Sequence, residues 1–225
     1  MATAKTEDTK EKTVAEAAPG VKVGDYIKFG SYYQENSSKK TPIEWLVLEK
    51  KEEELLLISR YGLDCRLYHH EYVDMTWEKC DLRKWLNNDF LNEAFTSDER
   101  KKIKVSSLIN NDDDDGFLVK TKGGNSTQDR VFCLSRSEAK NYFKDEAACK
   151  CKATKYAASK NYCWIDSDAS STGYGYSYWW LRSSGPDKQR AASCVDMNGV
   201  HWWTSCLILI DGITVRPALR IIWNE

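Results

Sequence analysis

The 225-residue sequence has few histidines, no surplus of basic charge and no long apolar segment. Its 33 lysines and arginines stand against 34 aspartates and glutamates, so the formal net charge is −1. A protein that binds nucleic acid through phosphate contacts needs a basic surplus or a local basic patch, and we find neither. No apolar run approaches the roughly 18 residues that indicate a membrane span. We therefore expect no nucleic-acid partner and no membrane span.

Common catalytic motifs are also missing. The three histidines, His69, His70 and His201, do not have the spacing of a zinc protease site or of a general base beside a nucleophile. The stretch "KGGNSTQ" lacks the lysine that follows the glycines of a phosphate-binding loop. We expect no enzymatic activity and no cofactor.

An acidic stretch, "NDDDDG", has the alternating oxygen ligands of a calcium loop at Asn111, Asp113 and Asp115. Such a loop ends in a bidentate glutamate, and here that position holds Lys122, a cation where two oxygens are required. We interpret this stretch as a solvated acidic turn without a metal ion.

Eight cysteines are scattered at irregular spacing in a chain too large to need disulfides for its stability. They are Cys65, Cys80, Cys133, Cys149, Cys151, Cys163, Cys194 and Cys206. Cys149, Cys151 and Cys163 offer three thiols, but a structural zinc ion requires four nitrogen or sulfur ligands. We expect reduced thiols and no metal site.

Residues 1–20 mix lysine, glutamate, threonine and alanine and lack the apolar core of a secretory signal. We predict a flexible leader, followed by one domain over residues 21–225. Without a signal, a cytoplasmic or phage-associated protein is favoured.

The period of the apolar residues predicts sheet in the first third of the chain and helices in the middle. "VKVGDYIKFGSYYQ" alternates like a half-buried strand, and "IEWLVLEK" and "ELLLISR" form a predicted hairpin around residues 51–53. "DMTWEKCDLRKWLNNDFLNEAF" has helical spacing, with Thr76 as the predicted cap. A shorter helix is predicted to start at Ser97.

The second half is predicted to return to sheet. Ser135 and Glu138 have the spacing of a capping box, which indicates a helix start. "NNDDDDGFLVKTKGGNSTQDR" is rich in turn residues and predicts a long surface loop. From Tyr178 onward, short β-rich runs alternate with turns such as Asn198-Gly199 and Asp211-Gly212. The fold class is therefore predicted to be α+β, with mixed short sheets and a few helices.

The apolar run in "VHWWTSCLILIDGITVRPAL" has two explanations. A continuous apolar stretch between turns is typical of a buried core strand. An exposed apolar patch of the same residues would mark an interaction surface, where desolvated tryptophans supply much of the binding energy. Periodicity alone does not separate the two.

A family resemblance bears on this choice. The segments "YWWLRSSG", "AASCVDMNGV" and "VRPALRI" resemble the C-terminal signature of the bacterial DUF6273 family, and "IKFGSYYQ", "TWEKCDLRKWLNNDFLNEAF" and "DRVFCLSRSEA" resemble its upstream part. Such families resemble the C-type lectin-like fold of formylglycine-generating enzymes. Some members resemble the variable proteins of diversity-generating retroelements, in which a reverse transcriptase rewrites the end of the gene and one rigid scaffold displays many surfaces.

The resemblance divides the C-terminal region, about residues 179–219, into framework and variable positions. It implies that the framework consists of Trp179, Trp180, Leu181, Arg182, Ala192, Val195, Gly199, Ile208, Val215, Arg216, Pro217, Ala218 and Leu219. The implied ligand-binding positions are Asp187, Lys188, Gln189, Arg190, Cys194, Asp196, Met197, His201, Trp202, Trp203, Thr204, Ser205, Cys206, Leu207, Leu209, Ile210, Asp211 and Ile213.

The resemblance therefore implies a non-enzymatic binding protein for a protein ligand on a cell or virion surface. Trp202 and Trp203 would each bury about 150–250 Å² against that ligand. An undiversified carbohydrate- or surface-binding module is the first alternative. The second is an oxidase like the formylglycine-generating enzymes, which would need a reactive cysteine pair or a copper site, with Cys194 and Cys206 in the right region.

Overall fold

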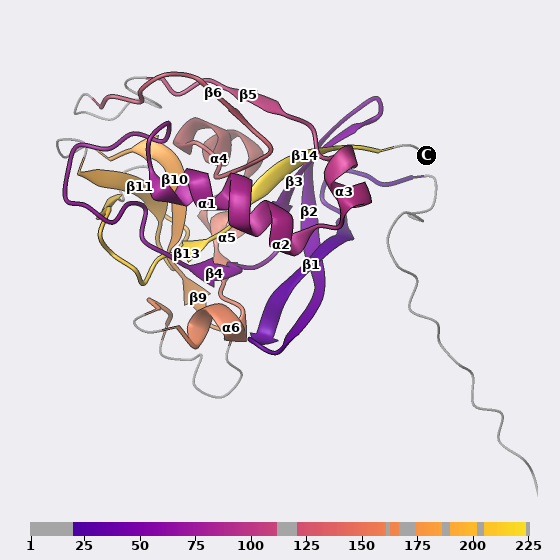
Figure 1. The fold of residues 1–225 in the computed structure, drawn as a ribbon, viewed down its shortest axis with the longest axis horizontal. Coiled ribbons are helices and arrows are strands. Elements are labelled where there is room, and N and C mark those ends of the chain that lie inside the picture. Colours follow the sequence, from indigo (N-terminus) through magenta and orange to yellow (C-terminus); the bar gives the residue numbers. More distant parts are fainter. Residues whose placement is uncertain are drawn as a thin grey trace, which may run out of the picture.

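The first sheet begins with the predicted hairpin and takes in the last strand of the chain. The computed structural model describes residues 20–111, 121–160, 163–166, 174–185, 190–201 and 205–223. The sheet has the strand order β1-β2-β3-β14-β7, and every neighbouring pair is antiparallel (Figure 1). Its strands are β1 (Tyr26–Asn36), β2 (Lys39–Lys51), β3 (Glu54–Ser59), β7 (Val131–Phe132) and β14 (Ala218–Ile222). The prediction of a hairpin from β2 and β3 is confirmed.

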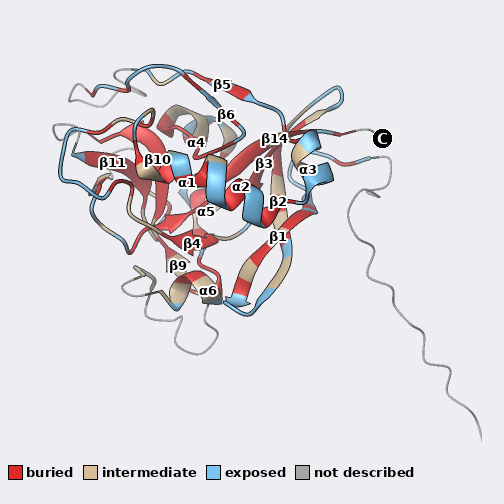
Figure 2. Cartoon of the chain, viewed as in Figure 1, coloured by how far each residue is buried: buried red, intermediate tan, exposed pale blue. Residues whose placement is uncertain are grey.

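The second sheet carries most of the region with the predicted framework. Its order is β12-β11-β10-β13-β4, with β10 and β13 parallel and the other pairs antiparallel. The strands are β4 (Asp64–Cys65), β10 (Trp179–Ser184), β11 (Ala191–Val195), β12 (Ser205–Leu207) and β13 (Thr214–Val215). Every residue of β10 and β11 is buried, so both faces of these two strands are covered (Figure 2).

A helical segment from Asp81 to Ala94 packs against the first sheet. It consists of α1 (Asp81–Trp85), a π-helical turn η1 (Leu86–Phe90) and α2 (Leu91–Ala94), which follow one another directly. Phe90 meets Tyr32 of β1 with 5.1 Å between ring centroids. The helix therefore covers the sheet through aromatic contacts.

The predicted start of this helix at Thr76 is wrong. The N-cap is Cys80, whose Sγ accepts a hydrogen bond from the backbone N–H of Arg83. Trp77 is fully buried and its indole N–H donates to Asp129 Oδ2 at 2.9 Å. This long-range contact holds the residues before Cys80 outside the helix.

The remaining helices are short and capped by side chains. They are α3 (Ser97–Lys102), α4 (Arg136–Tyr142), α5 (Glu146–Cys149) and α6 (Lys155–Ala158). Ser135 and Glu138 form the predicted capping box of α4, and Thr96 and Glu99 form another at α3. The hydroxyl and the carboxylate of each box satisfy backbone N–H groups that the first turn leaves free. Both helix starts are thus fixed locally.

Two small antiparallel sheets complete the fold. They pair β5 (Ser106–Leu108) with β6 (Thr127–Asp129), and β8 (Cys151–Lys152) with β9 (Tyr176–Ser177). The predicted long loop therefore ends earlier than expected, because Thr127 and Asp129 are buried in a strand. Residues 112–120 of that loop, with Asp113 and Asp115, lie outside the described residues.

The architecture is α+β, with several short, mainly antiparallel sheets and few helices, as predicted. Four tryptophans, Trp45, Trp77, Trp179 and Trp180, are completely buried in the core. None of the helices in the described ranges has the length and apolar character required to cross a membrane.

Candidate ligand-binding surface

The predicted framework positions are all buried. Trp179, Trp180, Leu181, Ala192, Val195, Val215, Ala218 and Leu219 are 0% exposed, and Arg182, Gly199, Arg216 and Pro217 are also buried. Gly199 adopts a φ of +90°, and a Cβ there would collide with the backbone carbonyl of Glu146. A glycine is therefore required at this turn.

The two framework arginines make structural hydrogen bonds. Arg182 binds the carboxylate of Glu138 with two nitrogens, and its Nη1 also donates to the Cys133 carbonyl at 3.1 Å. Arg216 Nε donates to the Ser59 carbonyl at 3.0 Å, and its guanidinium lies 5.0 Å from the ring centroid of Trp179. These contacts tie the second sheet to α4 and to the first sheet.

The segment after β11 shows an alternation of exposure at Leu207, Ile208 and Leu209. Leu207 is 45% exposed and Leu209 is 39% exposed, whereas Ile208 between them is fully buried. The Ile208 carbonyl accepts from the N–H groups of Tyr68 and His69, both at 3.1 Å, and its own N–H donates to the Arg190 carbonyl. Because the backbone of Ile208 is hydrogen-bonded through both its N–H and its carbonyl, the side chains of Leu207 and Leu209 on either side of it point toward solvent.

Four of the predicted ligand-binding residues are buried, contrary to expectation. Cys194 and Ile213 are 0% exposed, Cys206 is 7% and His201 is 8%. Cys194 lies in a strand covered on both faces, and Ile213 directly precedes β13. These four side chains are shielded from solvent in the structure.

The other predicted positions divide between the surface and the residues that are not described. Arg190, Leu207, Leu209 and Asp211 are exposed, and Asp196, Met197, Ser205 and Ile210 are partly exposed. Asp187, Lys188, Gln189, Trp202, Trp203 and Thr204 lie outside the described residues.

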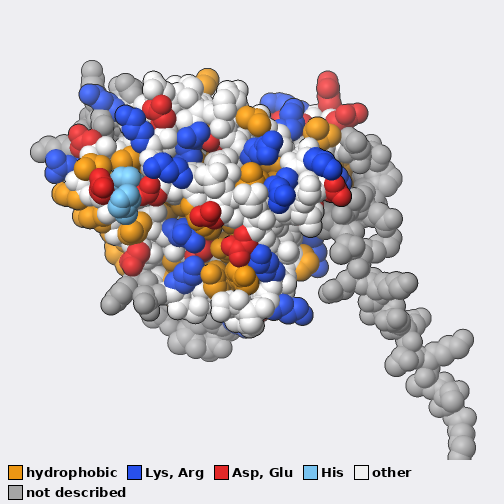
Figure 3. Space-filling model, in the orientation of Figure 1, with side chains coloured by type: hydrophobic (Ala, Val, Ile, Leu, Met, Phe, Trp, Pro, Cys, Tyr) orange, Lys and Arg blue, Asp and Glu red, His pale blue; other side chains and the backbone are white. Residues whose placement is uncertain are grey.

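Sequence reasoning missed Tyr72 and Val73, which are 52% and 40% exposed. The Arg190 guanidinium lies 5.0 Å from the ring centroid of Tyr72, and its Nε is 3.5 Å from Asp74 Oδ1. No period in "HHEYVDM" marks these residues. We call Leu207, Leu209, Tyr72, Val73 and Arg190 the display patch. Figure 3 shows hydrophobic side chains around the pale-blue histidine side chains on one face of the molecule.

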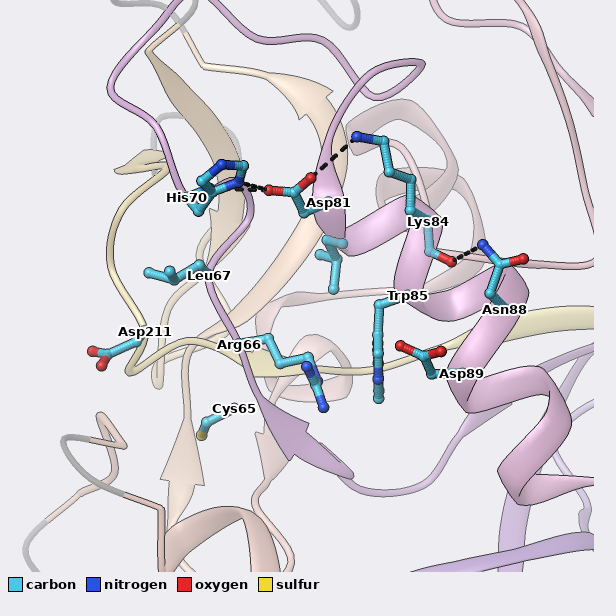
Figure 4. A pocket seen from close by; sticks show the side chains of 11 residues that line it. Cys65, Arg66, Leu67, His70, Asp81, Lys84, Trp85, Asn88, Asp89 and Asp211 are labelled. Atoms are coloured by element: carbon cyan, nitrogen blue, oxygen red, sulfur yellow. Dashed lines mark hydrogen bonds and ion pairs between the residues drawn. The ribbon is translucent and has the colours of Figure 1, made fainter.

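A cleft of about 520 Å³ is lined in part by His70 and Asp211, which are two residues from Tyr72 and Leu209 of the display patch in the sequence. One wall comes from residues 65–70, another from α1 and η1, and Asp211 contributes from the C-terminal segment (Figure 4). Arg66 lies over Trp85, with 4.0 Å between the guanidinium carbon and the ring centroid, and its Nε is 3.5 Å from Asp64 Oδ2.

Asp81 is the cleft residue whose carboxylate accepts hydrogen bonds from two other lining residues. His70 and Lys84 both point at its carboxylate in Figure 4, with Lys84 Nζ 3.2 Å from Oδ1. Partial burial raises the pKa of Asp81, but the hydrogen bonds from His70 and Lys84 outweigh it and lower the pKa to about 2. The same hydrogen bond raises the pKa of His70 above its ordinary value.

The described part of the chain contains one group of three side chains able to ligate a metal: His69, His70 and Asp81, whose ligand atoms lie within 4.8 Å of one another. A cation there would have to displace the donors that Asp81 already accepts from His70 and Lys84. The ammonium of Lys84 would also repel it. This arrangement favours a hydrogen-bonded charge cluster over a metal centre.

The family described as "Domain of unknown function (DUF6273)" matches residues 52–223. The chain belongs to this family. The DUF6273 match begins in the turn after β2, so β1 and β2 precede it although they share a sheet with β3. No curated protein and no solved structure matches the chain.

Proposed function

We propose that this DUF6273 protein is a non-enzymatic ligand-binding protein with a C-type lectin-like scaffold and a variable C-terminal surface. The exposure pattern at Leu207, Ile208 and Leu209 is the observation that carries the proposal. A core strand would bury both leucines, whereas here the framework isoleucine is buried and its two neighbours face solvent. Buried framework next to exposed variable positions is the arrangement that a display scaffold requires.

A protein is the proposed ligand, on a cell or virion surface. Apolar side chains of Tyr72, Val73, Leu207 and Leu209 provide the contact area, and Arg190 beside Asp74 provides a polar edge. A patch of this kind is typical of protein interfaces. Because backbone hydrogen bonds already fix Ile208, binding would cost little loop ordering.

The proposed origin of the surface is a diversity-generating retroelement. We expect a near-copy of the 3′ end of the gene close by, differing from it mainly at adenines, together with a reverse transcriptase gene. Sequencing the gene's neighbourhood checks this. If both are absent, the undiversified surface-binding module replaces the proposal.

The display patch itself is tested by the double substitution Leu207→Asp and Leu209→Asp. Binding of the labelled parent protein and of the labelled double variant is measured on a panel of bacterial cells and virions. We expect that any cell or virion that binds the parent protein will not bind the double variant. Stability should stay near that of the parent, because both side chains are already partly exposed to solvent.

Matched controls separate binding from folding. Val105→Asp and Ile109→Asp place the same charge at exposed apolar positions away from the patch, which are 54% and 66% exposed. Both should bind like the parent. Ile208→Ala should cost about 2–5 kcal/mol of unfolding free energy, as for a core truncation. Retained binding by the double variant would contradict the proposal.

The oxidase alternative gains one observation, since the structure brings Cys194 Sγ and Cys206 Sγ to 2.9 Å. A metal ion held by two thiolates, with metal–sulfur bonds of about 2.3 Å, separates the sulfurs by about 3.8 Å at a tetrahedral angle. The observed separation is shorter and favours a bond between the sulfurs over a metal bridge. The cysteine pair therefore supports redox chemistry of the protein itself more than an oxidase site.

A further inference from the structure

The eight cysteines are all free thiols, yet four of them lie in two close pairs. Cys194 of β11 and Cys206 of β12 have 2.9 Å between their Sγ atoms. Their strands are neighbours, and β12 is the outermost strand of the second sheet. Both residues are buried, Cys194 at 0% and Cys206 at 7% exposed.

The second pair lies at the opposite edge of the same sheet. Cys65 is in β4, the outermost strand on that side, and its Sγ is 2.8 Å from Cys163 Sγ. Cys163 is partly exposed and follows α6, and its backbone N–H donates to the Lys160 carbonyl. Cys65 also lines the cleft that contains Asp81.

We propose that Cys194–Cys206 and Cys65–Cys163 are disulfide-forming sites that fasten both edges of the second sheet when the protein is oxidised. In each pair the sulfurs are within roughly 1 Å of the S–S bond length of about 2.05 Å, so a small side-chain movement closes the bond. The metal-ligating group in the described residues contains no cysteine, and neither pair has a third ligand there. This inference does not depend on the proposed function.

The oxidant is a peroxide, which is small enough to reach a nearly buried thiol. The Cys206 thiolate attacks one peroxide oxygen, so an S–O bond forms, the O–O bond breaks and hydroxide leaves. The Cys194 sulfur then attacks Cys206 Sγ, so the S–S bond forms and the S–O bond breaks. The second hydroxide leaves with the proton of the Cys194 thiol as one water, and the hydroxide from the peroxide takes up the proton that Cys206 lost on forming its thiolate, which gives the other water. Two thiols are oxidised and one hydrogen peroxide is reduced to two waters.

The roles within each pair follow from their hydrogen bonds and exposure. The hydrogen bond from Cys194 lowers the pKa of the Cys206 thiol, whereas burial raises the pKa of Cys194. Cys206 therefore supplies the first thiolate. In the second pair, Cys163 is the more exposed thiol and accepts the hydrogen bond from Cys65, so it reacts first.

The test uses the full chain, reduced with dithiothreitol, desalted and exposed to hydrogen peroxide. Non-reducing peptide mapping by mass spectrometry should find Cys194 linked to Cys206 and Cys65 linked to Cys163. Thiols counted under denaturing conditions should fall from eight, the full set of free cysteines, to four. The melting temperature should rise on oxidation and return after reduction.

Variants identify the pairs. Cys194→Ser should leave a sulfenic acid at Cys206 that dimedone labels, with the other link intact. Cys151→Ala is the control, because Cys151 lies in neither pair and both links should form in it. Loss of thiols without these two links, links between other cysteines, or eight thiols left after peroxide would each overturn the proposal.

Discussion

At the scale of single residues, the exposure of residues 205–210 fits neither explanation of the apolar run, a buried core strand or a continuous exposed patch. The run is neither a core strand nor a continuous surface, because Cys206 and Ile208 are buried while Leu207 and Leu209 are exposed. The framework resemblance identified Ile208 correctly. It did not identify Cys194 or Ile213 as core residues, because their burial comes from strands that pair over long sequence distances.

The contact between Asp81 and His70 predicts how the protein responds to pH. In Asp81→Asn, the pKa of His70 should fall toward the ordinary value of about 6.5, because the acceptor for the protonated ring loses its charge. Histidine ring signals followed by NMR through a pH titration measure this. Asp98→Asn, at an exposed helix position, is the control and should leave the pKa of His70 unchanged.

The pKa shifts of His70 and Asp81 determine how the stability of the protein changes with pH. The raised pKa of His70 contributes stability below its unfolded value, and this contribution is lost as pH rises through the folded value. The lowered pKa of Asp81 contributes stability above its unfolded value, which is lost as pH falls toward about 2. An unchanged His70 titration in Asp81→Asn would contradict the contact.

At the scale of elements, the sequence patterns predicted correctly those helix starts and strand pairs that depend on residues close in sequence. The hairpin of β2 and β3 and the capping box of Ser135 and Glu138 depend on residues close in sequence, and both are present. The helix start at Cys80 and the strand β6 were not predicted. Both depend on Asp129, which accepts from Trp77 and Arg83 more than 40 positions earlier. No periodicity reports such a contact.

Asp129 therefore gives the prediction that belongs to this scale. Asp129→Ala removes the acceptor of the Trp77 indole N–H, of Arg83 Nε at 2.6 Å and of the Thr127 hydroxyl. Leaving these donors unpaired in a buried site should cost about 3–5 kcal/mol. Urea unfolding measures the change. Asp98→Ala breaks an exposed pair with Lys101 and should cost less than about 1 kcal/mol.

At the scale of the whole molecule, the chain's last strand completes its first sheet. β14 lies between β3 and β7 and is hydrogen-bonded to both, with Ala218 paired to Ile58 and to Phe132. The order of strands along the sequence predicts no such insertion, since consecutive strands more often lie side by side. This placement was therefore visible only in the structure.

A chain that ends at Pro217 should lose cooperative unfolding. It lacks β14, whose Ala218, Leu219 and Ile221 are almost completely buried, so β3 loses one of its two neighbouring strands and β7 loses its partner. Circular dichroism during a thermal ramp should show a broad change in place of one transition. A cooperative melt at the parent temperature would show that β14 is dispensable.

The position of β14 also bears on synthesis. Because β14 is far behind β3 in the sequence, β3 stays without one of its two neighbours until residues 218–222 have left the ribosome. Its run of leucines is then an open edge on a nascent chain, where it can pair with another molecule. Slow synthesis of the residues between β3 and β14, or high expression, should therefore favour aggregation, and a chaperone that shields nascent chains should raise the soluble yield.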